Sequence, residues 1–201
     1  GVCVAVCPSE ARAVKVMWAR VMPLGVGVYD VAALVENQNP DLVLVNLPYS
    51  LRILDEDNLF ITRIIGVLAL APREQFVIFK TNIDVGQRQP ARAFIDFTGP
   101  PIWWRGADKP ELTVSDQRFT ASPPLLQARL VNNSLKSYRG IEVAAVLSDN
   151  LRNAFAASLT IVEELAPGEM REISFSWPRP FAGEPVFIDF YPHAVVRSGD
   201  N

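Results

Sequence analysis

The feature that most constrains this chain is an internal repeat. Four short segments recur in the same order, at offsets between 93 and 96 residues. The pairs are Ala33–Asn37 with Arg129–Asn133, Tyr49–Asn58 with Glu142–Asn150, Leu70–Glu74 with Leu165–Glu169, and Phe94–Phe97 with the identical Phe187–Phe190. A single match would mean little, but four matches in order at nearly constant spacing predict two copies of one domain.

Short segments rich in β-branched and aromatic residues predict strands throughout the chain. The segment 91–97 alternates, so Ala93, Ile95 and Phe97 should face one side of a sheet and Phe94 and Asp96 the other. Residues 11–22 are ambiguous, and their β-branched residues favour a strand. Other expected strands are Val28–Val35, Tyr49–Leu54 and Gln75–Lys80, with turn residues between them.

The repeat spacing is that of an immunoglobulin-sized sandwich, and 201 residues suffice for two such domains. The sequence therefore predicts an all-β chain of two consecutive immunoglobulin/fibronectin-III-like β-sandwiches. Gly and Pro residues on both sides of Ile102-Trp103-Trp104-Arg105 place a linker there. The expected order is a cysteine-containing remnant (1–8), the first sandwich (9–100), the linker (101–110), the second sandwich (111–196) and a disordered tail (197–201).

Composition excludes several classes of protein. Proteins that bind nucleic acids usually carry an excess of basic residues, so the 19 basic and 22 acidic residues argue against a nucleic-acid partner. The longest uncharged apolar stretches are nine residues, Val21–Tyr29 and Ile64–Pro72, whereas a transmembrane helix needs about 20. Because the chain begins at Gly1 without an initiator Met, we expect any signal or anchor to lie upstream.

The cysteines, Cys3 and Cys7, lie together near the start of the chain. Two interpretations stay open: free thiols in a tail, or the end of a disulfide-bonded element whose remainder lies upstream. Disulfides imply an oxidising compartment. A zinc site needs about four ligands, and His193 is the only histidine, so no metal is expected.

Both copies resemble known sandwich families. Leu130–Asn133, Ser148–Asn150, Leu165–Glu169 and the aromatic strand Ile173–Trp177 resemble bacterial CARDB and FxLYD-type surface domains. Val35–Pro40 and Leu47–Leu51 are similar to late-embryogenesis-abundant type 2 or WHy domains, although Arg73 stands where the Leu-Ala-Pro turn expects Gly. The first residues, with Cys3 and Cys7, resemble the tail of an Asp-Cys-Gly-Gly-x-Cys element of bacterial surface proteins. These resemblances imply an extracytoplasmic protein that spaces, displays or binds.

No pattern indicates catalysis. His193, which any Ser-His-Asp or Cys-His arrangement would need, is expected to be an exposed residue near the C-terminus. Ser134 and Lys136 could form a nucleophile pair, but a turn after Asn132-Asn133 is favoured. Gly25-Val26-Gly27 lacks the third glycine and the helix of a dinucleotide fingerprint and should bend the chain into the next strand.

Two further clusters have more than one interpretation. Asp55-Glu56-Asp57-Asn58 could hold calcium, but a hairpin turn favours the same residue types and is preferred. Trp103 and Trp104, with Arg105, could bind a glycan or a protein at an interdomain joint, and burial at that joint is favoured. Trp177 should belong to a core.

The resulting hypothesis is a non-enzymatic module without a cofactor, cell-surface or secreted, that spaces, displays or adheres. The alternative is a glycan- or protein-binding module that uses Trp103, Trp104 and Arg105. A desiccation-stress protein and a hydrolase are less favoured.

Overall fold

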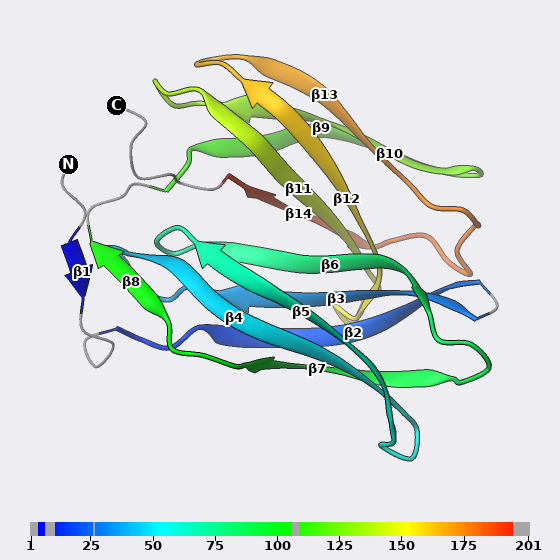
Figure 1. Cartoon of the computed structure of the whole chain (residues 1–201). Helices are drawn as coiled ribbons and strands as arrows, with labels where there is room; N and C mark the ends of the chain where they lie inside the picture. The colour runs from blue at the N-terminus through cyan, green and yellow to red at the C-terminus, as the bar shows by residue number, and fades with distance from the viewer. Residues whose placement is uncertain (1–3, 7–10, 26, 106–108, 195–201) are drawn as a thin grey trace. The chain divides into compact units, whose positions relative to one another are not determined.

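The computed structural model describes residues 4–6, 11–25, 27–105 and 109–194. Within these residues the chain is all β, with fourteen strands in antiparallel sheets (Figure 1). It divides into two compact units between Lys109 and Pro110. No helix in the described part of the chain is long and apolar enough to cross a membrane.

The first unit is a sandwich of two sheets. One sheet has the order β2-β3-β6, and in the other β4 pairs with β5, β7 and β8, while β1 extends the sheet beside β8. From β2 onward, the chain crosses between the sheets after β3, β5 and β6, as in immunoglobulin-type sandwiches. The strands are β1 (Val4–Val6), β2 (Lys15–Gly25), β3 (Val28–Glu36), β4 (Leu42–Asp55), β5 (Phe60–Leu70), β6 (Gln75–Asp84), β7 (Pro90–Phe97) and β8 (Ile102–Arg105).

The second unit repeats this arrangement with six strands. Its sheets have the orders β13-β10-β9 and β12-β11-β14, which correspond to β6-β3-β2 and β5-β4-β7 of the first unit. The strands are β9 (Leu112–Ala121), β10 (Pro124–Asn132), β11 (Tyr138–Ser148), β12 (Ala154–Leu165), β13 (Met170–Ser176) and β14 (Phe187–His193). Both expected sandwiches are therefore present.

Each unit has its own core, formed by alternate residues of facing strands. In the first unit Val31 and Val35 of β3 pack with Leu51 and Ile53 of β4. In the second unit Leu126, Leu130, Val143, Leu147 and Phe175 do the same for β10, β11 and β13. Every second side chain of a strand points to the same face of its sheet, and burial of these apolar side chains holds the two sheets of each unit together.

The ambiguous segment near the start of the first unit is a strand, β2, as preferred. The expected alternation in β7 is also confirmed, because Ala93 belongs to the core, Ile95 and Phe97 pack against it, and Phe94 is exposed. Gly27 adopts a positive φ of 74° in the turn between β2 and β3, the bend that was expected there.

The expected linker is wrong for residues 102–105. These residues form β8, which pairs with Leu42–Asn46 of β4 and with β1. β7 pairs with the later half of β4, and β8 pairs with the earlier half on the same side of β4, after Thr98–Pro101. The Gly and Pro residues of Thr98–Pro101 therefore separate two strands of one sheet instead of two domains, because Pro cannot donate to a ladder and is tolerated between strands.

The identical Phe-Ile-Asp-Phe segments occupy different registers. Leu54 and Ser148 are equivalent, since each stands at the same bulge before the β4–β5 or β11–β12 turn. Leu54 pairs with Arg92, whereas Ser148 pairs with Phe187. Phe187 therefore corresponds to Arg92 and not to Phe94. The two segments therefore differ by two positions in their pairing with β4 and β11. A shift of two residues leaves each side chain on the same face of the sheet, so both registers are compatible with the same sequence.

Candidate functional site

A buried polar residue with several hydrogen bonds, Asn132, stands at the end of β10 in the second unit. It is fully buried, and its Nδ2 donates to the carbonyl oxygens of Lys136 (2.7 Å), Ala166 (3.0 Å) and Leu165 (3.1 Å). Its Oδ1 accepts from the backbone N–H of Ser134 (3.0 Å). One side chain thus joins the ends of β10 and β12 with the start of β11.

Asn37 does the same at the end of β3 in the first unit. It is fully buried, and its Nδ2 donates to the carbonyl oxygens of Leu42 and Ala71, both at 2.8 Å. Its Oδ1 accepts from the backbone N–H of Asn39 (3.0 Å). Asn39 in turn bonds both backbone groups of Arg12, which ties the entry of β2 to this corner.

A carboxylate closes the facing turn in both units. Glu169 accepts from the backbone N–H of Ala166 (2.8 Å), and Glu74 accepts from that of Ala71 (2.6 Å). The hydrogen bond from the Ala166 N–H is the largest cause that holds the pKa of Glu169 below its ordinary value of 4.5, and the neighbouring Arg171 lowers it further. The Asn and Glu residues therefore form one repeated structural corner, named here the Asn–Glu corner (Asn37 and Glu74; Asn132 and Glu169).

The acidic cluster at Asp55 is a turn, as preferred. Asp55 Oδ1 accepts from the backbone N–H groups of Leu59 (2.8 Å) and Asp57 (3.1 Å). Asp149 Oδ1 makes the equivalent bonds to Asn153 (2.8 Å) and Leu151 (2.9 Å). Among the described residues no group of three or more His, Cys, Asp or Glu side chains is placed to hold a metal ion.

The two residues considered for nucleophilic chemistry lie in the Asn–Glu corner of the second unit. The Ser134 hydroxyl donates to Asn132 Oδ1 (2.8 Å) and accepts from the backbone N–H of Lys136 (3.1 Å). The hydroxyl thus shapes the β10–β11 turn that was favoured for this segment. The bonds between Ser134 and Lys136 involve the backbone of Lys136 and not its ammonium group.

His193 is not the exposed residue that was expected. It ends β14 opposite Glu142 and is 6% exposed. The strand continues through Tyr191 and Pro192, which keeps the imidazole within the sheet. The lone histidine is therefore part of the folded unit.

The tryptophans of β8 have different surroundings because adjacent residues of a strand face opposite sides. Trp103 pairs with Leu44, is 2% exposed and belongs to the core of the first unit. A buried indole cannot stack on a sugar ring. Trp104 is half-buried beside Val43, and Arg105 is exposed and forms an ion pair with Asp41 (3.3 Å).

Trp177 belongs to the core of the second unit, as expected, and its Nε1 donates to the carbonyl of Ala157 (2.9 Å). Cys3 and Cys7 lie outside the described residues. A disulfide that involves Cys3 or Cys7 therefore stays a prediction.

A polar hollow of about 250 Å³ lies on the sheet β13-β10-β9 and was not foreseen. A bulge opposite Ala128 creates it, and Asp116 takes a positive φ of 54° there. Arg129 bonds Asp116 at 2.7 Å, and both side chains are about half exposed. The lining is Asp116, Arg118, Gln127, Ala128, Arg129 and Glu172.

Asp30 of β3 is a second polar group that the sequence did not single out. It is 3% exposed and accepts from the backbone N–H of Asn82 (3.2 Å), where a bulge gives Asn82 a positive φ of 56°. Burial raises the pKa of Asp30, and hydrogen bonds from Thr81 and Asn82 partly oppose this. Neither bulge has a simple sequence signal, since both bulged residues are non-glycine.

Comparison with known proteins identifies no family. No family model and no curated protein sequence matches the chain. Among solved structures, red sea bream transglutaminase is similar at 13% identity with a TM-score of 0.26, over 89% of this chain and 29% of the transglutaminase. The chain thus corresponds to less than a third of the length of that enzyme, and so low a TM-score carries no argument.

Proposed function

We propose that this chain is a non-enzymatic structural and interaction module of an extracytoplasmic protein, cell-surface or secreted, in which two sandwiches space, display or attach other parts. The observation that supports the proposal most is the repeated Asn–Glu corner. In both units its buried asparagine, Asn37 or Asn132, is hydrogen-bonded to backbone groups and so joins strands. The resemblance to CARDB, FxLYD and late-embryogenesis-abundant type 2 domains favours the same role.

The experiment is a test of location with the full-length native protein. An epitope tag in the exposed β11–β12 turn at Leu151 should be reached by antibody on intact cells, and by added protease, without permeabilisation. A cytosolic protein expressed in the same cells serves as the control for lysis. A tag that is detected only after permeabilisation, in the cytosolic fraction, would contradict the proposal.

Ligand binding at Trp104 and Arg105 is the second candidate, now without Trp103. Its support is the partial exposure of the Trp104 indole next to an exposed guanidinium. Glycans screened on an array should give a signal that Trp104→Ala abolishes and Trp18→Ala, a half-buried tryptophan of β2, does not. An array without signal for the unaltered chain would end this candidate.

A further inference from the structure

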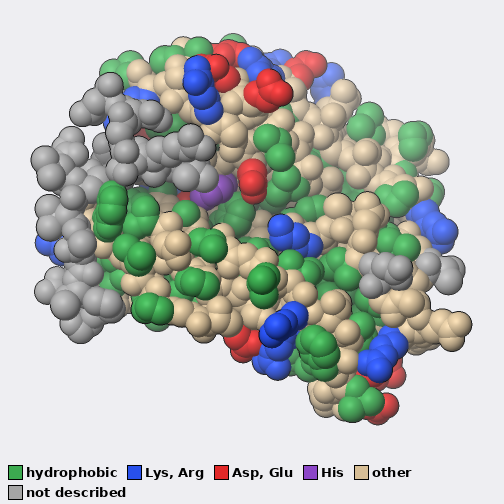
Figure 2. Space-filling view, viewed as in Figure 1, with side chains coloured by type: hydrophobic (Ala, Val, Ile, Leu, Met, Phe, Trp, Pro, Cys, Tyr) green, Lys and Arg blue, Asp and Glu red, His purple; other side chains and the backbone are tan. Residues whose placement is uncertain are grey.

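The strand β5 combines an open edge with exposed apolar side chains. It pairs with β4 and ends the sheet order β1-β8-β4-β5. Ile65 and Val67 are 74% and 61% exposed. Figure 2 shows hydrophobic side chains gathered over β4 and β5 on the face turned to the viewer. Edge strands with exposed apolar residues are templates for pairing with another strand.

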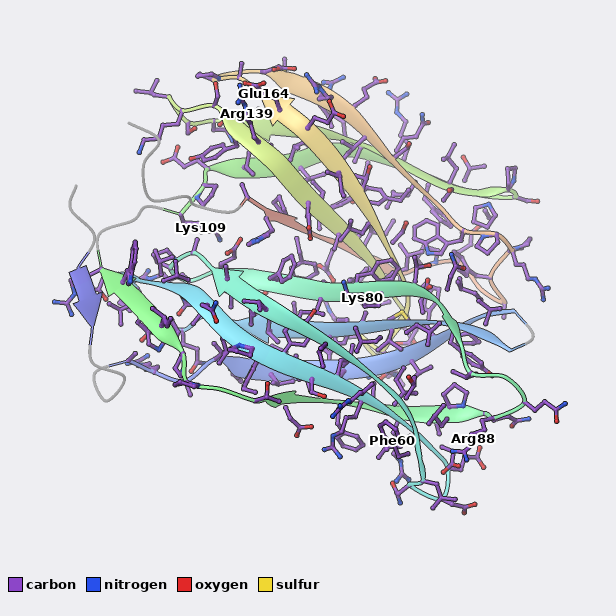
Figure 3. All side chains as sticks on the ribbon, viewed as in Figure 1. Phe60, Lys80, Arg88, Lys109, Arg139 and Glu164 are labelled. Atoms are coloured by element: carbon purple, nitrogen blue, oxygen red, sulfur yellow. The ribbon has the colours of Figure 1, made fainter. Side chains whose placement is uncertain are left out.

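Most of the β5 edge could pair with a further strand. Arg88 donates to the carbonyl oxygen of Phe60 at 2.7 Å, so the first residue of β5 already has a partner (Figure 3). From Thr62 to Leu68 the strand contains no proline and only one charged residue, Arg63. Native sheets usually protect such an edge with charges or proline, and β5 has little of either.

The corresponding strand of the second unit is better protected. By register, Ile65 and Val67 correspond to Leu159 and Ile161 of β12. β12 continues with Glu163 and Glu164, and Glu164 forms an ion pair with Arg139 at 3.3 Å (Figure 3). β12 therefore offers a natural control for experiments on β5.

The charges around β5 are complementary to a second β5 in antiparallel orientation. Asp57 lies eight residues before Ile65, and Arg73 lies eight residues after it, and both are exposed. If two β5 strands pair in antiparallel orientation about Ile65, Asp57 of each chain lies near Arg73 of the other chain. The two-fold symmetry gives two such pairs of opposite charge. Within the pairing, Arg63 stands opposite Val67 of the other chain, so no like charges are directly opposed.

We propose that β5 is a self-association edge, through which two copies of this chain join their β4–β5 sheets into one continuous sheet by antiparallel pairing over Thr62–Leu68. The interface is isologous, with the two-fold axis at Ile65. Backbone hydrogen bonds and burial of Ile65 and Val67 stabilise it, as in other strand additions. This goes beyond a spacer role, because it makes the module a dimerising one.

The test is the mass of the full chain in solution, measured by analytical ultracentrifugation between about 1 and 200 μM, a range that covers weak dimers. A reducing agent is present so that Cys3 and Cys7 cannot cross-link chains. We expect a concentration-dependent rise from 22.2 kDa to twice that mass. A chain that stays monomeric throughout this range would overturn the proposal, and a different protein would then be the candidate partner of the β5 edge.

Charge swaps at the two-fold axis test the pairing itself. Ile65→Lys and Ile65→Asp each place like charges opposite one another, and each should weaken the dimer about tenfold or more. An equimolar mixture should dimerise again, because Lys then faces Asp. The control variant Ile161→Lys, at an exposed isoleucine of β12 that corresponds to Val67, should dimerise like the unaltered chain. Loss of the dimer in Ile161→Lys but not in Ile65→Lys, or a mixture that stays monomeric, would overturn pairing through β5.

Discussion

The Asn side chains of the Asn–Glu corner show how single residues can organise a sandwich. A buried amide can donate two hydrogens and accept at its oxygen, and Asn132 meets three carbonyl oxygens and one N–H. Those backbone groups belong to segments that diverge at a corner and so cannot satisfy one another through a ladder. An apolar residue here would leave them buried without partners, which costs more than the bonds themselves contribute.

We expect Asn132→Ala to lower the free energy of unfolding of the second unit by about 2–3 kcal/mol. Asn132→Asp should cost more, because a carboxylate would face carbonyl oxygens instead of donating to them. Urea denaturation followed by circular dichroism measures both. The control is Asn133→Ala, whose exposed side chain bonds Thr113 Oγ1 and should change stability by under about 0.5 kcal/mol. Equal losses at positions 132 and 133 would contradict the role of the buried amide.

Glu169 should make stability depend on pH. Its pKa is lower in the folded chain than its ordinary value of 4.5, so its ionised form favours folding above that pH. The contribution is lost as pH falls below about 4.5 through the folded pKa. The melting temperature should drop less over this range in Glu169→Gln, which keeps an acceptor for Ala166. An unchanged pH profile in Glu169→Gln would show that the carboxylate is not the titrating group.

At the scale of elements, the β4–β5 pair depends on one close approach. Gly66 of β5 lies opposite Tyr49 of β4, and the buried Tyr49 ring covers it. A Cβ at position 66 would lie 2.4 Å from the Tyr49 hydroxyl oxygen. The glycine thus leaves the room that a large aromatic side chain fills on the adjacent strand.

Gly66→Ala should therefore destabilise the first unit by about 1–3 kcal/mol through overpacking. Gly183→Ala is the matched control, since a Cβ there meets nothing within 4 Å and its φ is not positive. Thermal unfolding by calorimetry distinguishes the two variants. Combining Gly66→Ala with Tyr49→Leu should cost less than the sum of the single changes, since the clash is then relieved. Additive losses would contradict the contact.

At the scale of the whole molecule, the first unit extends to Lys109 and not to residue 100, so a stable fragment of this unit must include β8. β8 places Trp103 in the first core, so a fragment of residues 1–100 lacks a buried aromatic that a fragment of residues 1–109 retains. We expect the shorter fragment to be less stable by about 3–5 kcal/mol, the usual cost of removing a buried Trp side chain. Guanidinium denaturation of the two fragments measures the difference.

Two controls accompany this prediction. Trp103→Ala in the full chain should reproduce most of the loss, and Trp104→Ala, at a half-buried position, should cost clearly less. Fragments 1–100 and 1–109 of equal stability would mean that β8 contributes nothing to the first unit.

The sequence by itself determined the β class, the two sandwiches and the turn at Asp55. These depend on local rules, since side-chain alternation and the hydrogen-bonding habits of Asp, Asn, Gly and Pro act within a few residues. The internal repeat also singled out the segments that contain Asn37, Asn132 and the Leu-Ala-Pro-x-Glu turns, but not the bonds between them, because the bonded residues are separated by more than thirty positions.

Only the tertiary structure decided the registers, the burial of Trp103 and His193, and the extent of the first unit. Alternation with period two is unchanged by a slide of two residues, so Phe94–Phe97 and Phe187–Phe190 look equivalent in sequence although their strands pair differently. The residues Thr98–Pro101 resemble a domain boundary, but the bonds of β8 to β4 come from a strand some sixty residues earlier. Long-range pairing of this kind decides where each unit ends, and local residue patterns do not contain it.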